Sequence, residues 1–145
     1  MFYKIRHIGV VTSKFTECSR IFQNIFGFKK IEKKKIIIGK YIDNLVALKN
    51  VKLNICYFRT MDGITIELLH YTKPKSLKNK IKSNNLGVSH LSFSIKDYEI
   101  FKNKIKFTNI KPLGKIQISE DKKVLVAYYI LLDEILLEVV QEIGN

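Results

Sequence analysis

The sequence is poor in cysteine and has no long hydrophobic run. It contains only two cysteines, Cys18 and Cys56, and they form no CxxC pair. We therefore expect reduced thiols rather than a disulfide framework. No apolar run reaches the length of a transmembrane helix, and the first residues do not resemble a signal peptide. These absences predict a cytoplasmic protein without a membrane segment.

Acidic residues and arginine are also scarce. The chain has 13 acidic against 26 basic residues, a formal net charge of +13. Such an excess suggests an anionic partner. However, only Arg6, Arg20 and Arg59 are arginine, the residue that base-reading and bidentate phosphate sites favour. We therefore interpret the lysines as a solvated surface and expect no nucleic-acid partner. An anionic small substrate is compatible with either interpretation.

The sequence contains an internal repeat. A stretch centred on His7, residues 5–11, has a later counterpart centred on His90, residues 87–95. Each is followed by the motif Asp-x-Ile-x-x-Glu and two apolar residues, which ends at Leu69 in the first copy and at Val140 in the second. A chain of 145 residues fits one compact domain or two small modules sharing a core. The repetition favours the two modules.

Hydrophobic periodicity gives each half the order β-α-β-β-β. In the first half we expect a strand over 4–11, a helix capped by Ser13 and ended by Gly27, a strand over 28–38 interrupted at 33–35, a strand over 51–60, a turn at 61–63 and a strand over 64–70. In the second half we expect a strand over 88–95, a helix capped by Asp97, a broken strand over 110–118, a strand over 123–132, a turn at 133–134 and a strand over 135–142. This divides the chain into module 1 (1–71), a linker (72–86) and module 2 (87–145).

One insertion distinguishes the two copies. His7 and His90 lie 83 positions apart, whereas Glu67 and Glu138 lie 71 positions apart. The difference of 12 equals the length of residues 39–50, which read as a short helix within a long connection. Insertions in paired modules often form binding loops or lids.

The repeated His and Glu residues are the candidates for chemistry. Glu67 and Glu138 each stand among apolar neighbours in a strand, where a carboxylate is costly to bury unless it is paired or bound to a cation. Together with His7 and His90 they form a mixed nitrogen and oxygen set that suits Zn, Ni, Co, Mn or Fe(II). Each residue could instead be satisfied locally, but recurrence at matching places in both copies favours one shared metal site.

Other polar residues lack such a counterpart. His70 matches Gln141 in the second copy, so we interpret it as a surface histidine or as one that supports the ligands. Cys18 fits the buried face of the first helix and is assigned to the core. Tyr41 and Arg59 are plausible pocket residues, as is Asp43, although the sequence does not fix where they point.

At this point the sequence resembles the vicinal-oxygen-chelate superfamily, which includes glyoxalase I, methylmalonyl-CoA epimerase, extradiol dioxygenases and the fosfomycin and bleomycin resistance proteins. The stretches that carry the resemblance are His7-Ile-Gly-Val, Phe26-Gly-Phe, Gly63-Ile-Thr-Ile-Glu-Leu-Leu, Gly87-Val-Ser-His-Leu-Ser-Phe-Ser-Ile and Leu131-Leu-Asp-Glu-Ile-Leu-Leu-Glu-Val. The resemblance implies an α+β fold in which two βαβββ modules form a curled mixed β-sheet cup with helices outside.

The resemblance also implies a function. It assigns one divalent ion (Zn, Ni, Co or Mn) to His7, Glu67, His90 and Glu138. The related dioxygenases use only the positions of His7, His90 and Glu138, so Glu67 favours the lyase and isomerase branch of glyoxalase I and the epimerase. There a metal-stabilised enediolate forms next to a carbonyl, with Glu138 expected as the base and Glu67 as its partner. The implied substrate carries vicinal oxygens, as a thioester or glutathione adduct does, and the implied assembly is a homodimer.

Two alternatives stay open. An Fe(II) extradiol-type dioxygenase would depend on oxygen. A metal-free drug-binding protein of the bleomycin-resistance type would show neither tight metal binding nor turnover. No glutathione- or CoA-anchoring pattern is recognisable in the chain, so the sequence does not choose the substrate.

Overall fold

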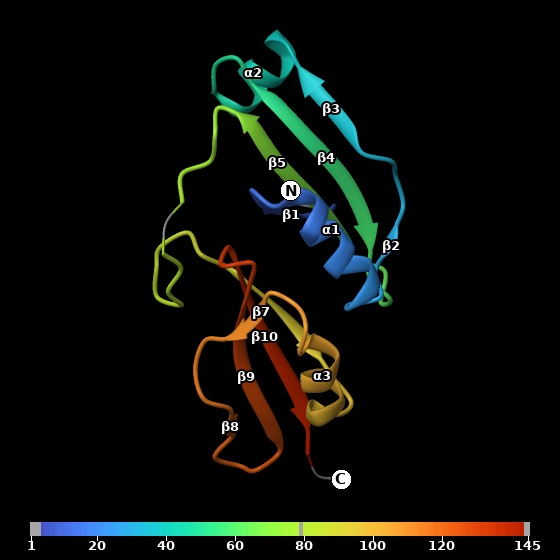
Figure 1. Ribbon diagram of the computed structural model, residues 1–145, viewed down its shortest axis with the longest axis vertical. Coiled ribbons are helices and arrows are strands. Elements are labelled where there is room, and N and C mark those ends of the chain that lie inside the picture. Colours follow the sequence, from blue (N-terminus) through green and yellow to red (C-terminus); the bar gives the residue numbers. More distant parts are fainter. Residues whose placement is uncertain (1–3, 79, 144–145) are drawn as a thin grey trace. The chain divides into compact units, whose positions relative to one another are not determined.

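The computed structural model describes residues 4–78 and 80–143 (Figure 1). The chain divides into two compact units, Met1–Lys78 and Asn79–Asn145, with a boundary inside the predicted linker 72–86. Each unit contains one five-stranded sheet with parallel and antiparallel pairs, which confirms the α+β class. None of the helices in the described ranges is long and apolar enough to cross a membrane. That the two modules act as one domain stays a prediction.

The first unit follows the predicted order of elements. These are β1 (Ile8–Val11), α1 (Phe15–Asn24), β2 (Lys29–Lys30), β3 (Lys35–Ile38), α2 (Lys40–Val46), β4 (Lys52–Arg59) and β5 (Thr65–Lys73). The sheet order is β1-β5-β4-β2, and β3 also pairs with β4. β1 runs parallel to β5, whereas β4 and β5 form an antiparallel hairpin. The hairpin turns at Gly63, whose φ of 91° suits a residue without a side chain.

The second unit repeats this topology. Its elements are β6 (His90–Ser94), α3 (Tyr98–Ile105), β7 (Ile110–Pro112), β8 (Gln117–Ile118), β9 (Val124–Leu131) and β10 (Ile135–Glu142). The sheet order is β6-β10-β9-β7, with β8 also paired to β9, and β6 runs parallel to β10. The internal repeat read from the sequence is therefore confirmed at the level of each module.

Aromatic packing under α1 shows which face of the first sheet is covered. Phe22 of α1 is fully buried, and its ring lies 5.4 Å from that of Phe58 on β4. Because side chains alternate along a strand, Tyr57 points to the other face. Phe58 pairs with Ile66 and Tyr57 with Glu67 in the hairpin. Glu67 consequently lies on the face opposite α1.

The second unit has the same division of faces. Phe101 of α3 contacts Tyr129 of β9, with 5.3 Å between the ring centroids. Tyr129 pairs with Leu137 of β10, which is fully buried. The neighbouring pair, Tyr128 with Glu138, therefore points away from α3.

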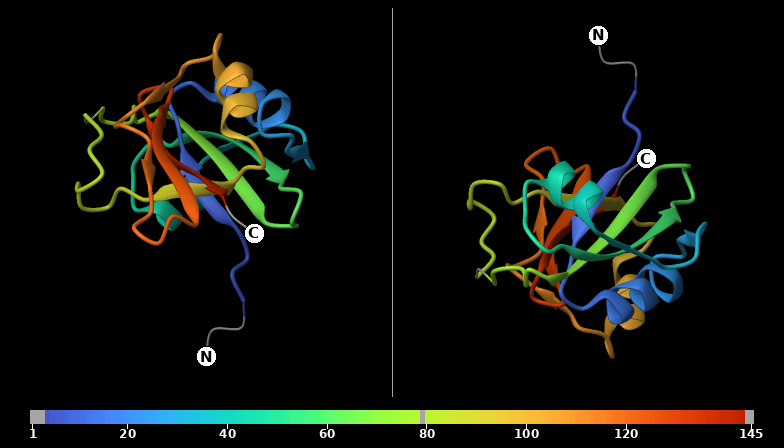
Figure 2. Two further views of the ribbon diagram at one scale, coloured as in Figure 1. Left: turned by 90° about the horizontal axis from the view of Figure 1, so that it is seen from below. Right: turned by 90° about the horizontal axis from the view of Figure 1, so that it is seen from above.

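The insertion 39–50 forms the predicted short helix, and it packs on the Glu67 face. Ile42 of α2 is buried in a cluster with Val51 and Leu53, and Leu69 of β5 packs against that cluster. Leu69 follows Glu67 by two residues and so shares its face. The right-hand view of Figure 2 shows α1 (blue) and α2 (teal) on opposite sides of the hairpin strands. The insertion therefore borders the surface that carries Glu67.

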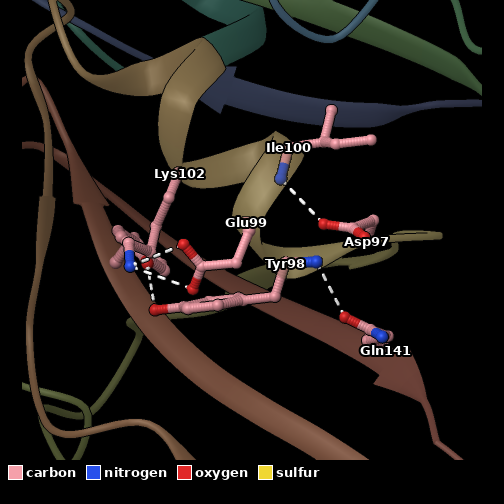
Figure 3. Close-up of polar contacts among 7 residues, drawn as sticks. Asp97, Tyr98, Glu99, Ile100, Lys102 and Gln141 are labelled. Atoms are coloured by element: carbon pink, nitrogen blue, oxygen red, sulfur yellow. Dashed lines mark hydrogen bonds and ion pairs between the residues drawn. The ribbon is translucent and has the colours of Figure 1, made fainter.

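Helix caps were predicted correctly in one unit and incorrectly in the other. Asp97 caps α3, because its side chain accepts a 2.8 Å hydrogen bond from the Ile100 N–H group (Figure 3). The same figure shows the Tyr98 N–H group donating to Gln141 of β10, which ties the start of the helix to the sheet. Ser13 is not the cap of α1. The cap position is Lys14, and the Lys14 N–H group donates to the Thr12 hydroxyl.

Several strands are shorter than predicted. β1 begins at Ile8, so His7 precedes the strand rather than lying within it. The strand predicted over 28–38 divides into β2 and β3 around the lysine run, and that over 110–118 divides into β7 and β8. The predicted turn at 133–134 is centred one residue earlier, where Leu132 and Asp133 both have positive φ. These shifts leave the predicted order of elements unchanged.

Candidate metal centre

His7 and Glu67 lie side by side in the first unit. β1 runs parallel to β5 with Gly9 opposite Glu67, and His7 points to the same face because it stands two residues before Gly9. His7 Nε2 is 3.1 Å from Glu67 Oε2. The Glu67 side chain is only 14% exposed, so its carboxylate is largely shielded from water. A shielded carboxylate needs compensating partners.

Tyr57 supplies the second partner of Glu67. Its hydroxyl donates a 2.5 Å hydrogen bond to Glu67 Oε1, the oxygen that does not face His7. This bond to Glu67, assisted by burial, raises the pKa of Tyr57 from 10.0 to about 12. The His7 and Tyr57 rings also meet edge to face, 6.1 Å apart. The three side chains form one connected set, His7–Glu67–Tyr57.

The second unit contains a matching set. His90 Nε2 is 3.5 Å from Glu138 Oε2, and the His90 and Tyr128 rings meet edge to face at 5.4 Å. Burial raises the pKa of the Tyr128 phenol, and a hydrogen bond to Glu138 raises it further. Ser92 adds a contact, because its hydroxyl donates to Glu138 Oε2 over 2.7 Å. Each predicted His and Glu is thus paired within its own unit.

The two tyrosines were missed in the sequence analysis, although the sequence contains a signal for them. Tyr128 follows Tyr57 by 71 positions, the same offset that separates Glu138 from Glu67. The Asp62-Gly63 turn also fixes the hairpin register, which places Tyr57 directly opposite Glu67. The repeated unit is therefore a triad of His, Glu and Tyr rather than a pair.

The donor geometry of each pair fits a divalent metal ion. Two ligands of one ion, each about 2.0–2.2 Å from it, lie about 3.0–3.5 Å apart at tetrahedral or octahedral angles. The separations of 3.1 and 3.5 Å between His Nε2 and Glu Oε2 match this spacing. Imidazole nitrogen with carboxylate oxygen suits Zn, Mn, Co, Ni or Fe(II). Across the described ranges, no three His, Cys, Asp or Glu side chains gather at one point, so each unit supplies two donors.

Other candidates lie away from these sets. His70 occupies the opposite face of β5 and stacks on Phe15 of α1, with ring centroids 6.3 Å apart. Cys18 is fully buried in α1, as predicted. Asp43 accepts backbone hydrogen bonds from Asn50 and Val51, so it holds the insertion together. These three residues have structural partners rather than a place beside Glu67.

Ionisation of Tyr57 gives a direct test of the first set. In the metal-free protein we expect Tyr57 to ionise near pH 12, because its hydroxyl donates to an anionic carboxylate. The folded pKa lies above the unfolded value, so this bond contributes its full stability below pH 10 and loses it as the pH rises through about 12. The ultraviolet absorbance of the wild type is titrated with pH, and the same titration of the Tyr57→Phe variant is subtracted. The difference isolates the signal of the Tyr57 phenol. A midpoint of this difference titration near pH 10 would contradict the hydrogen bond between Tyr57 and Glu67.

No protein-family model matches the chain. No curated protein sequence matches it significantly either. Solved structures do match. A glyoxalase family protein from Bacillus cereus is 17% identical, with a TM-score of 0.85 over 99% of this chain and 97% of that one. A glyoxylase/bleomycin resistance protein/dioxygenase domain from Frankia sp. EAN1pec is 13% identical, with a TM-score of 0.67 over 100% of this chain and 96% of that one.

A third similar structure contains a metal. The fosfomycin resistance protein FosX from Listeria monocytogenes, complexed with Mn(II) and sulfate, is 17% identical, with a TM-score of 0.61 over 100% of this chain and 95% of that one. At such identities the likeness concerns the fold and carries no residue roles. The likeness agrees with the sheet topology of both units. The chain has the fold of the vicinal-oxygen-chelate superfamily.

Proposed function

We propose that the chain is a divalent-metal enzyme that moves a proton next to a carbonyl group, as lyases and isomerases of the glyoxalase I and epimerase type do. The observation that carries this proposal is the triad of His, Glu and Tyr that occurs once in each unit. In each triad His Nε2 faces a Glu oxygen at a spacing suited to one ion. The metal-containing FosX neighbour supports a divalent ion in this fold.

The four proposed ligands are His7, Glu67, His90 and Glu138. One pair alone offers two donors, whereas protein metal sites of this type use three or four. Both pairs are therefore needed for one ion, whether they come from one chain or from two copies in a homodimer. A bound divalent ion would lower the energetic cost of negative charge on the carbonyl oxygen of the substrate.

The chain's own residues would handle the proton. A Glu carboxylate in a shielded setting can accept the proton next to the carbonyl and return it to the neighbouring atom. Tyr57 and Tyr128 would hold the two carboxylates in place as protonated phenols, and the contact with Glu67 or Glu138 raises the pKa of each phenol further from neutral pH. Two carboxylates related by the repeat can exchange the proton from different sides. The substrate class is a carbonyl compound with vicinal oxygens, such as a thioester or a glutathione adduct.

Solvent isotope exchange tests this function. The metal-loaded protein is incubated in deuterated water with glutathione hemithioacetals and with epimeric acyl-CoA thioesters, and NMR follows the proton next to the carbonyl. We expect catalysed exchange or conversion that does not need oxygen. Oxygen uptake with catechols would instead support the dioxygenase. Failure to bind Zn, Ni, Co or Mn, together with absence of turnover, would leave the drug-binding protein as the better account.

A further inference from the structure

The two triads differ in one residue beside the carboxylate. The residue two positions after each histidine stands opposite the glutamate in the parallel strand pair: Gly9 opposite Glu67 and Ser92 opposite Glu138. Ser92 donates to Glu138 Oε2, the oxygen that faces His90. Gly9 has no side chain, so the equivalent oxygen of Glu67 receives no hydroxyl from β1. The internal symmetry is broken at this position.

Space does not explain the glycine. A Cβ atom placed on Gly9 would lie 3.7 Å from Glu67 Oε2 and 3.4 Å from Leu69 Cδ1. The first distance is ordinary van der Waals contact, and the second involves the mobile end of a leucine side chain. Gly9 is also absent from the glycines with positive φ, so its backbone does not require glycine. A serine at this position would therefore fit and could reach Glu67 Oε2.

The hydroxyl contacts consequently hold different oxygens of the two carboxylates. Glu138 is held by the Ser92 hydroxyl on Oε2, the oxygen facing His90. Glu67 is held by Tyr57 on Oε1 alone, so its Oε2 keeps only His7 as partner in the described parts of the chain. Partners that orient a metal ligand commonly change metal affinity about 10- to 100-fold. Each carboxylate therefore accepts a hydroxyl hydrogen bond, but only in Glu138 does such a bond reach the oxygen that faces the histidine.

We propose that Ser92 is a positioning residue that fixes Glu138 as the constant metal ligand, whereas Gly9 leaves Oε2 of Glu67 free to change its contacts. This inference rests on the proposed metal site. It reverses the order implied by the family resemblance, because Glu67 rather than Glu138 becomes the group available to move a proton.

Calorimetric titration of the metal-free full chain with Mn²⁺ tests the inference. The variants are Ser92→Ala, Ser92→Thr and Gly9→Ser, and a thermal melt of each confirms that it is folded. We expect Ser92→Ala to weaken Mn²⁺ binding roughly tenfold and Ser92→Thr, which keeps the hydroxyl, to restore it. Gly9→Ser is expected to tighten binding, because it adds to Glu67 the contact that Glu138 already has.

The outcomes separate this inference from the proposed function. Mn²⁺ affinity of Ser92→Ala within about twofold of wild type would overturn the role of Ser92 while leaving the metal site standing. Equal weakness of Ser92→Thr and Ser92→Ala would also overturn it, because the hydroxyl would then not be the cause. Failure of the wild type to bind Mn²⁺, Zn²⁺, Co²⁺ or Ni²⁺ would overturn both this inference and the proposed function.

Discussion

Replacement of Glu67 by glutamine is expected to slow proton exchange next to the substrate carbonyl by roughly 100- to 10,000-fold. Glutamine keeps the size of the side chain and can still receive the Tyr57 hydrogen bond on its amide oxygen, but it cannot accept the substrate proton. The measurement is the isotope exchange rate of the metal-loaded variant. Mn²⁺ titration beside it separates loss of proton transfer from loss of the metal.

The matched controls for this prediction are Glu138→Gln and Glu99→Gln. Glu138 is held by Ser92, so its replacement should weaken Mn²⁺ binding more than Glu67→Gln does. Glu99 lies in α3, where it pairs with Lys102, and its replacement should change neither quantity (Figure 3). If Glu67→Gln exchanged protons at the wild-type rate while Glu138→Gln, still loaded with metal, did not, Glu138 would be the base.

Phe22→Ala is expected to destabilise the first unit by about 3–5 kcal/mol. Phe22 is completely buried in α1, and its ring contacts those of Phe26, Phe28 and Phe58. Removing it leaves a cavity between the helix and β4, next to the strand position that carries Tyr57. Urea denaturation followed by circular dichroism gives the free energy of unfolding.

The chain offers a matched phenylalanine as the control for that experiment. Phe107 is 93% exposed, so Phe107→Ala should change the free energy of unfolding by no more than about 0.5 kcal/mol. A loss below about 1 kcal/mol in Phe22→Ala would contradict the packing of α1 on β4, because removing a fully buried aromatic ring from a packed core costs about 3–5 kcal/mol.

The fold was predictable because its signals are local and repeated. Apolar periodicity located α1 and α3, and the Asp-Gly turn located the hairpin that carries Glu67. The shared motifs also revealed the insertion that forms α2. Predicted boundaries were less accurate where hydrogen bonds outside the pattern decide them. The cap of α1 is one case, since the hydroxyl of Thr12 occupies the Lys14 N–H group ahead of the helix.

The candidate site was predictable only in part, because side-chain partners depend on register. His7 and Glu67 were identified by type and recurrence, and the structure places them 3.1 Å apart. Tyr57 lies ten positions before Glu67 in sequence, and only the pairing of β4 with β5 brings their side chains together. The contact of Ser92 with Glu138 likewise needs the parallel register of β6 and β10. Tyr57 lies outside the Asp-x-Ile-x-x-Glu motif, and Ser92 lies in the stretch centred on His90 but has Gly9 as its counterpart, so neither contact was identified.

The most direct test of the account is the metal stoichiometry of the purified full chain, measured by mass spectrometry after saturation and desalting. The account predicts about one divalent ion per chain in the wild type and none in the Glu67→Gln, Glu138→Gln double variant, because one ion needs donors from both pairs. Two ions per chain would show that each pair binds on its own. No ion in the wild type, or equal loading in the double variant, would contradict the four-ligand site.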